Sequence, residues 1–149
     1  MNCSVFSLSK NTTLKLWYLA TGTELATLTG HSRGVNAVAI APDGKRAVSA
    51  SWDNTPKLWD LATGRELATL TGHSHWVDAV AIIPDGKQAV SASGGNTLKL
   101  WDLATGDVLA TFTGEGVMNS CAITPDGVTV VAGDGLGRVY FLRLEGLRG

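Results

Sequence analysis

Hydrophobic and polar residues alternate along this chain in short stretches, each interrupted by turn-forming residues. Residues 35–40 (VNAVAI) alternate in this way and end at a Pro-Asp-Gly turn, residues 42–44. Three similar stretches follow at residues 47–51, 57–61 and 66–71, each separated from the next by a short turn. Alternation over about four to eight residues indicates strands with one buried face. We therefore expect four antiparallel strands from this part of the chain.

The same pattern returns along the chain with a period of 42 residues. Trp17, Trp59 and Trp101 stand at this spacing, in the phrases TLKLWYLATG, TPKLWDLATG and TLKLWDLATG. A fixed period of this length is typical of repeat proteins, in which one unit cannot bury its hydrophobic face without a neighbour. The alternating stretches begin at residues 5–8, inside one unit, and end at residues 138–144, inside another. The pattern predicts an all-β chain of fourteen strands, with two complete four-stranded units between two incomplete ones.

Composition and charge exclude several classes of function. The 149 residues carry a net charge of −1, which gives no long-range attraction to nucleic acid or to an anionic membrane. Cys3 and Cys121 form neither a metal-ligand spacing nor a disulfide framework, so we expect no metal and no cofactor. The first residues lack the regions of a signal peptide, and no apolar run is long enough to cross a membrane. We expect a cytoplasmic protein.

Three motifs recur in phase with the tryptophans. They are the Gly-His pairs at 30–31 and 72–73, the Trp-Asp pairs at 59–60 and 101–102, and the Pro-Asp-Gly turns at 42–44 and 84–86. With these motifs the chain resembles the WD40 repeat family over essentially its whole length. The resemblance implies one domain, residues 1–149, that forms a partial WD40-type β-propeller. Its expected blades are residues 4–30 (partial), 31–72, 73–114 and 115–145 (partial).

The resemblance also implies a non-enzymatic scaffold that binds a protein or peptide on its loop rim. In this family, His31, Ser49, Asp53 and Trp59 would form an internal hydrogen-bonded tetrad, although Ser51 points to the same face as Ser49 and could replace it. The competing interpretation is a hydrolase, because Ser, His and Asp together can make an activated nucleophile. A buried polar group without a partner costs about 1–3 kcal/mol, which favours a structural network over catalysis.

The other repeats depart from this tetrad. The third blade keeps His73, Ser91 and Trp101, but Gly95 stands where the aspartate is expected. The last blade replaces all four tetrad residues, with Glu115, Ala132, Leu136 and Leu142. A nucleophilic enzyme would keep one intact triad beside an oxyanion site, and no such site is evident in the sequence. We expect no catalytic residues.

An incomplete set of blades leaves open sheet edges and apolar faces, which favour association. We therefore expect either self-association that completes the propeller or a chain that is the C-terminal part of a longer one. The alternative function is a sensor or regulatory propeller cut from a multidomain signalling kinase or nucleotide-hydrolysing enzyme.

The two central repeats allow an internal comparison. Residues 19–60 and 61–102 differ at 9 of 42 positions. Five differences fall in loops that share one rim: Arg33/His75, Gly34/Trp76, Asn36/Asp78, Trp52/Gly94 and Asp53/Gly95. Loops on a rigid frame commonly carry recognition residues, and Trp and Arg are enriched at binding hot spots. The predicted binding residues are Arg33, Trp52, His75 and Trp76; the alternative is that these loops drift and that Trp52 packs on a neighbouring blade.

Overall fold

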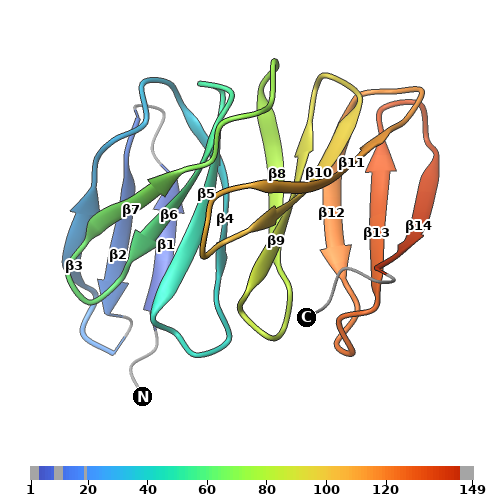
Figure 1. The fold of residues 1–149 in the computed structure, drawn as a ribbon. Helices are drawn as coiled ribbons and strands as arrows, with labels where there is room; N and C mark the ends of the chain where they lie inside the picture. The colour runs from blue at the N-terminus through green and yellow to red at the C-terminus, as the bar shows by residue number, and fades with distance from the viewer. Residues whose placement is uncertain (1–3, 9–11, 19, 145–149) are drawn as a thin grey trace.

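The fold consists of β-sheets that stand side by side in chain order (Figure 1). The computed structural model describes residues 4–8, 12–18 and 20–144. Within these residues it contains fourteen strands: β1 (Ser4–Leu8), β2 (Leu14–Tyr18), β3 (Thr23–Leu28), β4 (Val35–Ile40), β5 (Arg46–Ser51), β6 (Pro56–Asp60), β7 (Arg65–Thr69), β8 (Val77–Ile82), β9 (Gln88–Ser93), β10 (Thr97–Asp102), β11 (Val108–Thr113), β12 (Met118–Ile123), β13 (Thr129–Asp134) and β14 (Val139–Arg143).

All pairing is antiparallel between consecutive strands. Strands β4–β7 and β8–β11 form four-stranded sheets, while β1–β3 and β12–β14 form three-stranded sheets among the described residues. We call these sheets blades 1 to 4 in chain order. The expected fold class, a partial propeller with two complete and two incomplete blades, is confirmed. The six strands for which the sequence analysis gave bounds each lie within two residues of them.

The hydrophobic core lies between neighbouring blades rather than inside a single sheet. Trp59 of blade 2 packs with Leu14 and Leu28 of blade 1, and Trp101 of blade 3 packs with Leu58 and Leu70 of blade 2. Both indoles are fully buried. This explains why the tryptophan recurs once per repeat: each blade covers the face of the blade before it.

The glycine before each repeat histidine makes room for the indole. A Cβ atom on Gly72 would lie 3.0 Å from Cη2 of Trp101, which is closer than most side chains tolerate. The loops before β4, β8 and β12 lie on the upper edge in Figure 1, together with the turns after β5, β9 and β13. This upper rim carries the residues that the sequence comparison selected. Cys3 lies outside the described residues.

Candidate functional site

A buried polar network links three elements of blade 2. The indole Nε1–H of Trp59 donates to Oγ of Ser49 at 2.8 Å, and Nε2 of His31 lies 2.6 Å from the same oxygen. Nδ1 of His31 lies 2.7 Å from Oδ2 of Asp53. The serine is Ser49, because the hydroxyl of Ser51 instead donates to the backbone carbonyl of Gly34 at 2.9 Å.

The environment of this network disfavours nucleophilic chemistry. Burial lowers the pKa of His31, although the hydrogen bond to Asp53 opposes the effect. Burial would raise the pKa of Asp53, but hydrogen bonds from Thr55 and His31 outweigh it and lower that pKa. Ser49 is 0% exposed and its Oγ accepts the hydrogen bond of the Trp59 indole, so no substrate carbonyl can reach this oxygen in this conformation. The arrangement fixes strand packing instead.

Blade 3 repeats the network with a different third partner. Oγ of Ser91 lies 2.5 Å from Nε2 of His73 and accepts from Nε1–H of Trp101 at 2.7 Å. Nδ1 of His73 lies 3.2 Å from Oγ1 of Thr97, since Gly95 offers no carboxylate. Burial lowers the pKa of His73 to about 4.

Blade 4 contains a network that the sequence analysis missed. The phenol of Tyr140 donates to Oδ2 of Asp134 at 2.9 Å, and Oδ1 of Asp134 accepts from the backbone N–H groups of Leu136 and Arg138. Asp134 lies opposite Met118 in blade 4, as Ser93 lies opposite Val77 in blade 3, so the repeat predicts the place of Asp134 in its strand. Its partner was not, because Tyr140 stands where the other blades have a lysine.

The upper rim carries a pair of exposed tryptophans. Trp52, after β5, and Trp76, before β8, have ring centroids 5.4 Å apart with an interplanar angle of 36°. Trp52 is 45% exposed and Trp76 is 52% exposed. The structure therefore brings together two predicted binding residues from adjacent blades. Trp52 also packs on Trp76 of the neighbouring blade, so its ring contacts that blade and is at the same time partly exposed to solvent.

A groove of about 400 Å³ opens beside this pair. Its lining residues come from blades 2 and 3 and from the loop before β12: Trp52, His75, Trp76, Asp78, Gly94 and Val117. His75, another predicted residue, is exposed and lies over the Gly94-Gly95 backbone. Arg33 is exposed in the loop before β4 and does not line the groove.

Asp78 is the ionisable groove residue that the site prediction did not name. Its repeat equivalent, Asn36, donates from Nδ2 to the carbonyl of Val77 in the next blade at 3.1 Å. A carboxylate cannot donate in this way, and within the described residues the Asp78 side chain has no hydrogen-bond or ion-pair partner. Burial raises the pKa of Asp78, because no partner offsets the loss of hydration of its carboxylate in the free protein. The Asn36/Asp78 difference between repeats was the available signal.

Other kinds of site find no support in residues 4–8, 12–18 and 20–144. No group of three His, Cys, Asp or Glu side chains in these residues is placed to hold a metal ion. The same part of the chain contains no helix with the length and apolar character needed to span a membrane.

Comparisons with known proteins agree with this architecture. The family model described as the WD domain, G-beta repeat, matches residues 22–60. The model described as the TEP-1 C-terminal beta-propeller matches residues 73–144. A search of curated proteins found no match. The two matches, the His-Ser-Trp networks of blades 2 and 3 and the side-by-side stacking of antiparallel sheets lead to one assignment: the chain belongs to the WD40 repeat β-propeller family.

Proposed function

We propose that the chain is a non-enzymatic interaction module that binds a peptide segment of a partner protein in the upper-rim groove. WD40 propellers in general are protein-interaction domains, which sets the class of function. The observation that carries the location is the Trp52–Trp76 pair, two large apolar rings left half exposed across a blade junction. Aromatic anchors of this kind dominate the binding energy of protein interfaces.

The internal repeats support a recognition role for these rings. Gly94 is the repeat equivalent of Trp52, and Gly34 is the equivalent of Trp76. The same loops therefore fold with glycine at both positions, so neither tryptophan is needed to form the turn. The groove between the rings and Val117 offers apolar contact, and Asp78 offers an acceptor to a donor group of the ligand.

Affinity selection with a phage-displayed random peptide library tests this proposal directly. The wild-type chain serves as bait, and a Trp52→Gly/Trp76→Gly double variant serves as the matched control, because each substitution copies the residue of the other repeat. We expect enriched peptides that bind the wild type and lose at least about tenfold in affinity for the double variant. Enriched peptides that bind both proteins equally would place the binding site elsewhere.

The absence of catalysis is part of the proposal. Ser49, His31 and Asp53 have the connectivity of a hydrolase triad, but the Ser49 hydroxyl is enclosed between blades and bonded to Trp59. A fluorophosphonate probe should leave Ser49 unmodified in the folded protein. Covalent labelling of Ser49 would revive the hydrolase interpretation.

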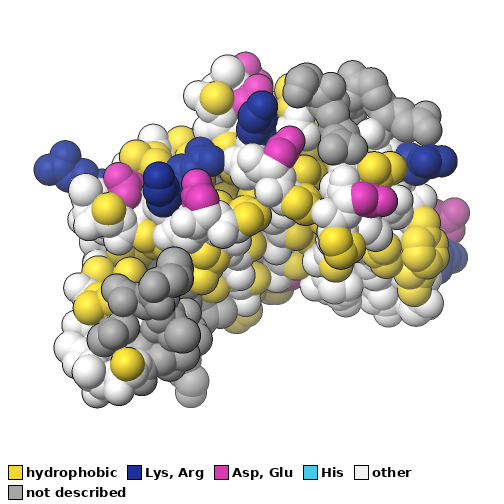
Figure 2. All heavy atoms as spheres, turned by 90° about the horizontal axis from the view of Figure 1, so that it is seen from below, with side chains coloured by type: hydrophobic (Ala, Val, Ile, Leu, Met, Phe, Trp, Pro, Cys, Tyr) yellow, Lys and Arg dark blue, Asp and Glu magenta, His cyan; other side chains and the backbone are white. Residues whose placement is uncertain are grey.

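The class of partner and the cellular location are proposals as well. Figure 2 shows the opposite rim, where basic and acidic side chains are interspersed among hydrophobic ones. This mixture supports a protein partner over nucleic acid or an anionic membrane, since both polyanions favour a basic surface. A cytoplasmic location remains a prediction.

We also propose that copies of the chain associate through their end blades. Phe141 is 72% exposed, whereas Leu100 at the same register of blade 3 is 4% exposed under blade 4. Val139 and Leu98 show the same contrast. This outer face of blade 4 has the composition of an inter-blade face, which favours a covering blade from a second copy.

A further inference from the structure

The upper-rim groove is built from positions at which the two central repeats differ. Six residues line it, and the sixth along the chain, Val117, lies beyond the compared repeats. The other five all stand where residues 19–60 and 61–102 carry different residues: Trp52, His75, Trp76, Asp78 and Gly94. The differences between the repeats therefore decide both the shape and the charge of this groove.

Gly94 leaves space in the groove. Its equivalent in blade 2 is Trp52, whose large ring stands on the rim. A Cβ atom on Gly94 would lie 3.9 Å from Cγ1 of Val117 and 4.0 Å from Cβ of His75. A larger side chain would therefore begin between two other lining residues. The groove of about 400 Å³ depends on a residue without a side chain at this point.

Asp78 is the extra residue of a β-bulge. Val77 lies opposite Ser93 and Ala79 lies opposite Ala92, so Asp78 has no counterpart in the ladder between β8 and β9. Bulges of this kind re-aim a side chain and are frequent beside functional sites. Here the bulge belongs to the lining of the groove.

The Asp78 carboxylate is an unused acceptor in this lining. Within the described residues its side chain has no hydrogen-bond or ion-pair partner. Backbone acceptors nearby are occupied: the carbonyl of Trp76 accepts from the N–H of Gly94 at 2.9 Å, and that of Val117 accepts from Gly135 at 2.9 Å. Burial raises the pKa of Asp78, and a bound cation would oppose that rise. The groove therefore favours a ligand group that is positively charged.

The indole rings beside the carboxylate favour a flat cation. The ring centroids of Trp52 and Trp76 are 5.4 Å apart, so the two rings contact each other and a ligand group must lie on an outer face. Indole faces attract cations. A guanidinium group stacks flat on such a face while its fork of N–H groups matches a carboxylate, whereas an ammonium group has no flat face.

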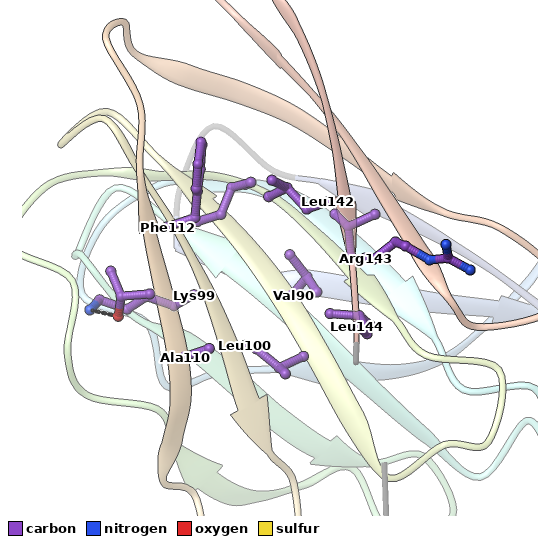
Figure 3. A pocket seen from close by; sticks show the side chains of 11 residues that line it. Val90, Lys99, Leu100, Ala110, Phe112, Leu142, Arg143 and Leu144 are labelled. Carbon is purple, nitrogen blue, oxygen red and sulfur yellow. Dashed lines mark hydrogen bonds between the residues drawn. The ribbon is translucent and has the colours of Figure 1, made fainter. Parts of the chain in front are cut away.

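The apolar pocket between blades 3 and 4 provides a contrast within the same chain. It has a volume of about 210 Å³, and its charged lining residues, Lys99 and Arg143, are both basic (Figure 3). The ammonium group of Lys99 donates to Oγ1 of Thr111 at 3.0 Å. A cation would meet like charges there, so a cationic ligand discriminates between this pocket and the rim groove.

We propose that the upper-rim groove recognises an arginine side chain of the partner peptide. The guanidinium group donates two N–H groups to the carboxylate of Asp78 and stacks on the outer face of Trp76, two residues earlier in the chain. The aliphatic stem of the arginine lies along the space beside Gly94 and Val117. This inference rests on the proposed function, since it names the ligand residue that the same groove selects.

Two small probes test the inference without a partner protein. One is N-acetyl-arginine methylamide, and the other is the corresponding citrulline compound, which has a similar shape and no charge. Each is titrated at neutral pH into isotope-labelled protein, and the indole N–H signals are followed by NMR. We expect a saturable shift of the Trp76 signal with the arginine probe and at least about tenfold weaker binding of the citrulline probe. The signals of Trp59 and Trp101, whose rings are fully buried, serve as internal references.

Two variants remove the same charge from different places. Asp78→Asn copies Asn36 of the other repeat, should weaken the arginine probe at least about tenfold and should make the two probes bind equally. Asp107 is exposed in the turn between β10 and β11, on the opposite rim. Asp107→Asn should therefore leave both affinities unchanged. Circular dichroism confirms that each variant is folded.

Equal affinity of the two probes for the wild type would overturn the inference, as would the absence of a saturable Trp76 shift with the arginine probe. A preference for arginine that persists in Asp78→Asn would also overturn it. The peptides selected on the wild type separate this inference from the proposed function. If they lose affinity for the Trp52→Gly/Trp76→Gly variant but bind Asp78→Asn unchanged, the groove binds peptides and the arginine assignment is wrong. If they bind both variants as well as the wild type, the proposed function fails with it.

Discussion

His75 packs so closely on Gly95 that a Cβ atom there would lie 3.0 Å from Cδ2 of the imidazole ring. In blade 2 the corresponding pair is Arg33 and Asp53, and Asp53 turns inward to His31. Two of the five rim differences between the repeats are therefore one coupled change. The histidine occupies space that opens only when the aspartate is replaced by glycine.

This coupling predicts a non-additive pair of substitutions. Gly95→Asp alone crowds His75 but also offers Nδ1 of His73 the carboxylate that it lacks, so its net change in stability should be small. Adding His75→Arg restores the pair found in blade 2, removes the crowding and should raise stability by about 1 kcal/mol beyond the sum of the two single variants. Urea unfolding of both single variants and the double variant measures the interaction. Strictly additive free energies would show that the two sites are independent.

Acid should destabilise the chain through His73. Its pKa in the folded state is about 4, against 6.5 for an ordinary histidine, so the unfolded state binds more protons in this window. Stability is therefore lost as the pH falls from 6.5 towards 4, and the lost free energy of unfolding between pH 7 and pH 5 is about 2 kcal/mol. Urea unfolding at both pH values measures it. A His73→Gln variant should show a clearly shallower dependence; an unchanged slope would assign the effect to other groups.

Removing the shared hydroxyl of blade 2 should cost more than its small volume suggests. Ser49→Ala leaves Nε1 of Trp59 and Nε2 of His31 without their buried partner. The expected loss is about 1–3 kcal/mol of unfolding free energy. Ser32→Ala, at an exposed serine in the preceding loop, is the control and should change stability by less than about 0.5 kcal/mol. Equal effects of the two substitutions would mean that the network contributes little.

Asp78→Asn should separate recognition from folding. The asparagine is already present at the equivalent position, as Asn36, so stability should be unchanged or slightly higher. Affinity for a rim-binding peptide that donates a hydrogen bond or carries a cation should fall about tenfold. Isothermal titration and thermal unfolding on the same preparations measure both quantities. A loss of stability without a loss of affinity would make Asp78 a structural residue.

Association through the outer face of blade 4 should depend on Phe141. Light scattering behind size exclusion should give a mass above that of the monomer for the wild type. Phe141→Lys introduces a charge on the exposed apolar face and should shift the mass to the monomer. If the wild type is a monomer at all concentrations, the proposed association through blade 4 is wrong.

The strands and their core positions were predictable because the sequence contains the same pattern in three successive units. The tryptophan at each third strand and the glycine beside each repeat histidine belong to one packing unit, so period and spacing sufficed to place the strands. The rim pair Trp52 and Trp76 was also accessible, since only loop positions differ between two nearly identical repeats.

The irregular parts depended on contacts that the sequence does not show. Tyr140 donates to Asp134 in the last blade, whereas the equivalent positions of blades 2 and 3 hold a lysine and a serine, so the repeat does not reveal this pair. The apolar pocket between blades 3 and 4 is lined by side chains such as Val90, Phe112 and Leu142, which three strands far apart in the sequence bring together. The sequence shows that Asp78 stands where the other repeat has Asn36. Only the structure shows that Asn36 donates a hydrogen bond to the carbonyl of Val77 across the blade junction, which Asp78 cannot do in its repeat.

The most direct test of the account is the affinity of one selected rim peptide for the wild type and for Trp76→Gly, measured by isothermal titration with thermal unfolding alongside. We predict at least about a tenfold loss of affinity and a melting temperature that moves by no more than about 4 °C, because Gly34 shows that the loop folds without the ring. An unchanged affinity, or a loss of affinity that only accompanies unfolding, would contradict a binding site at the tryptophan pair.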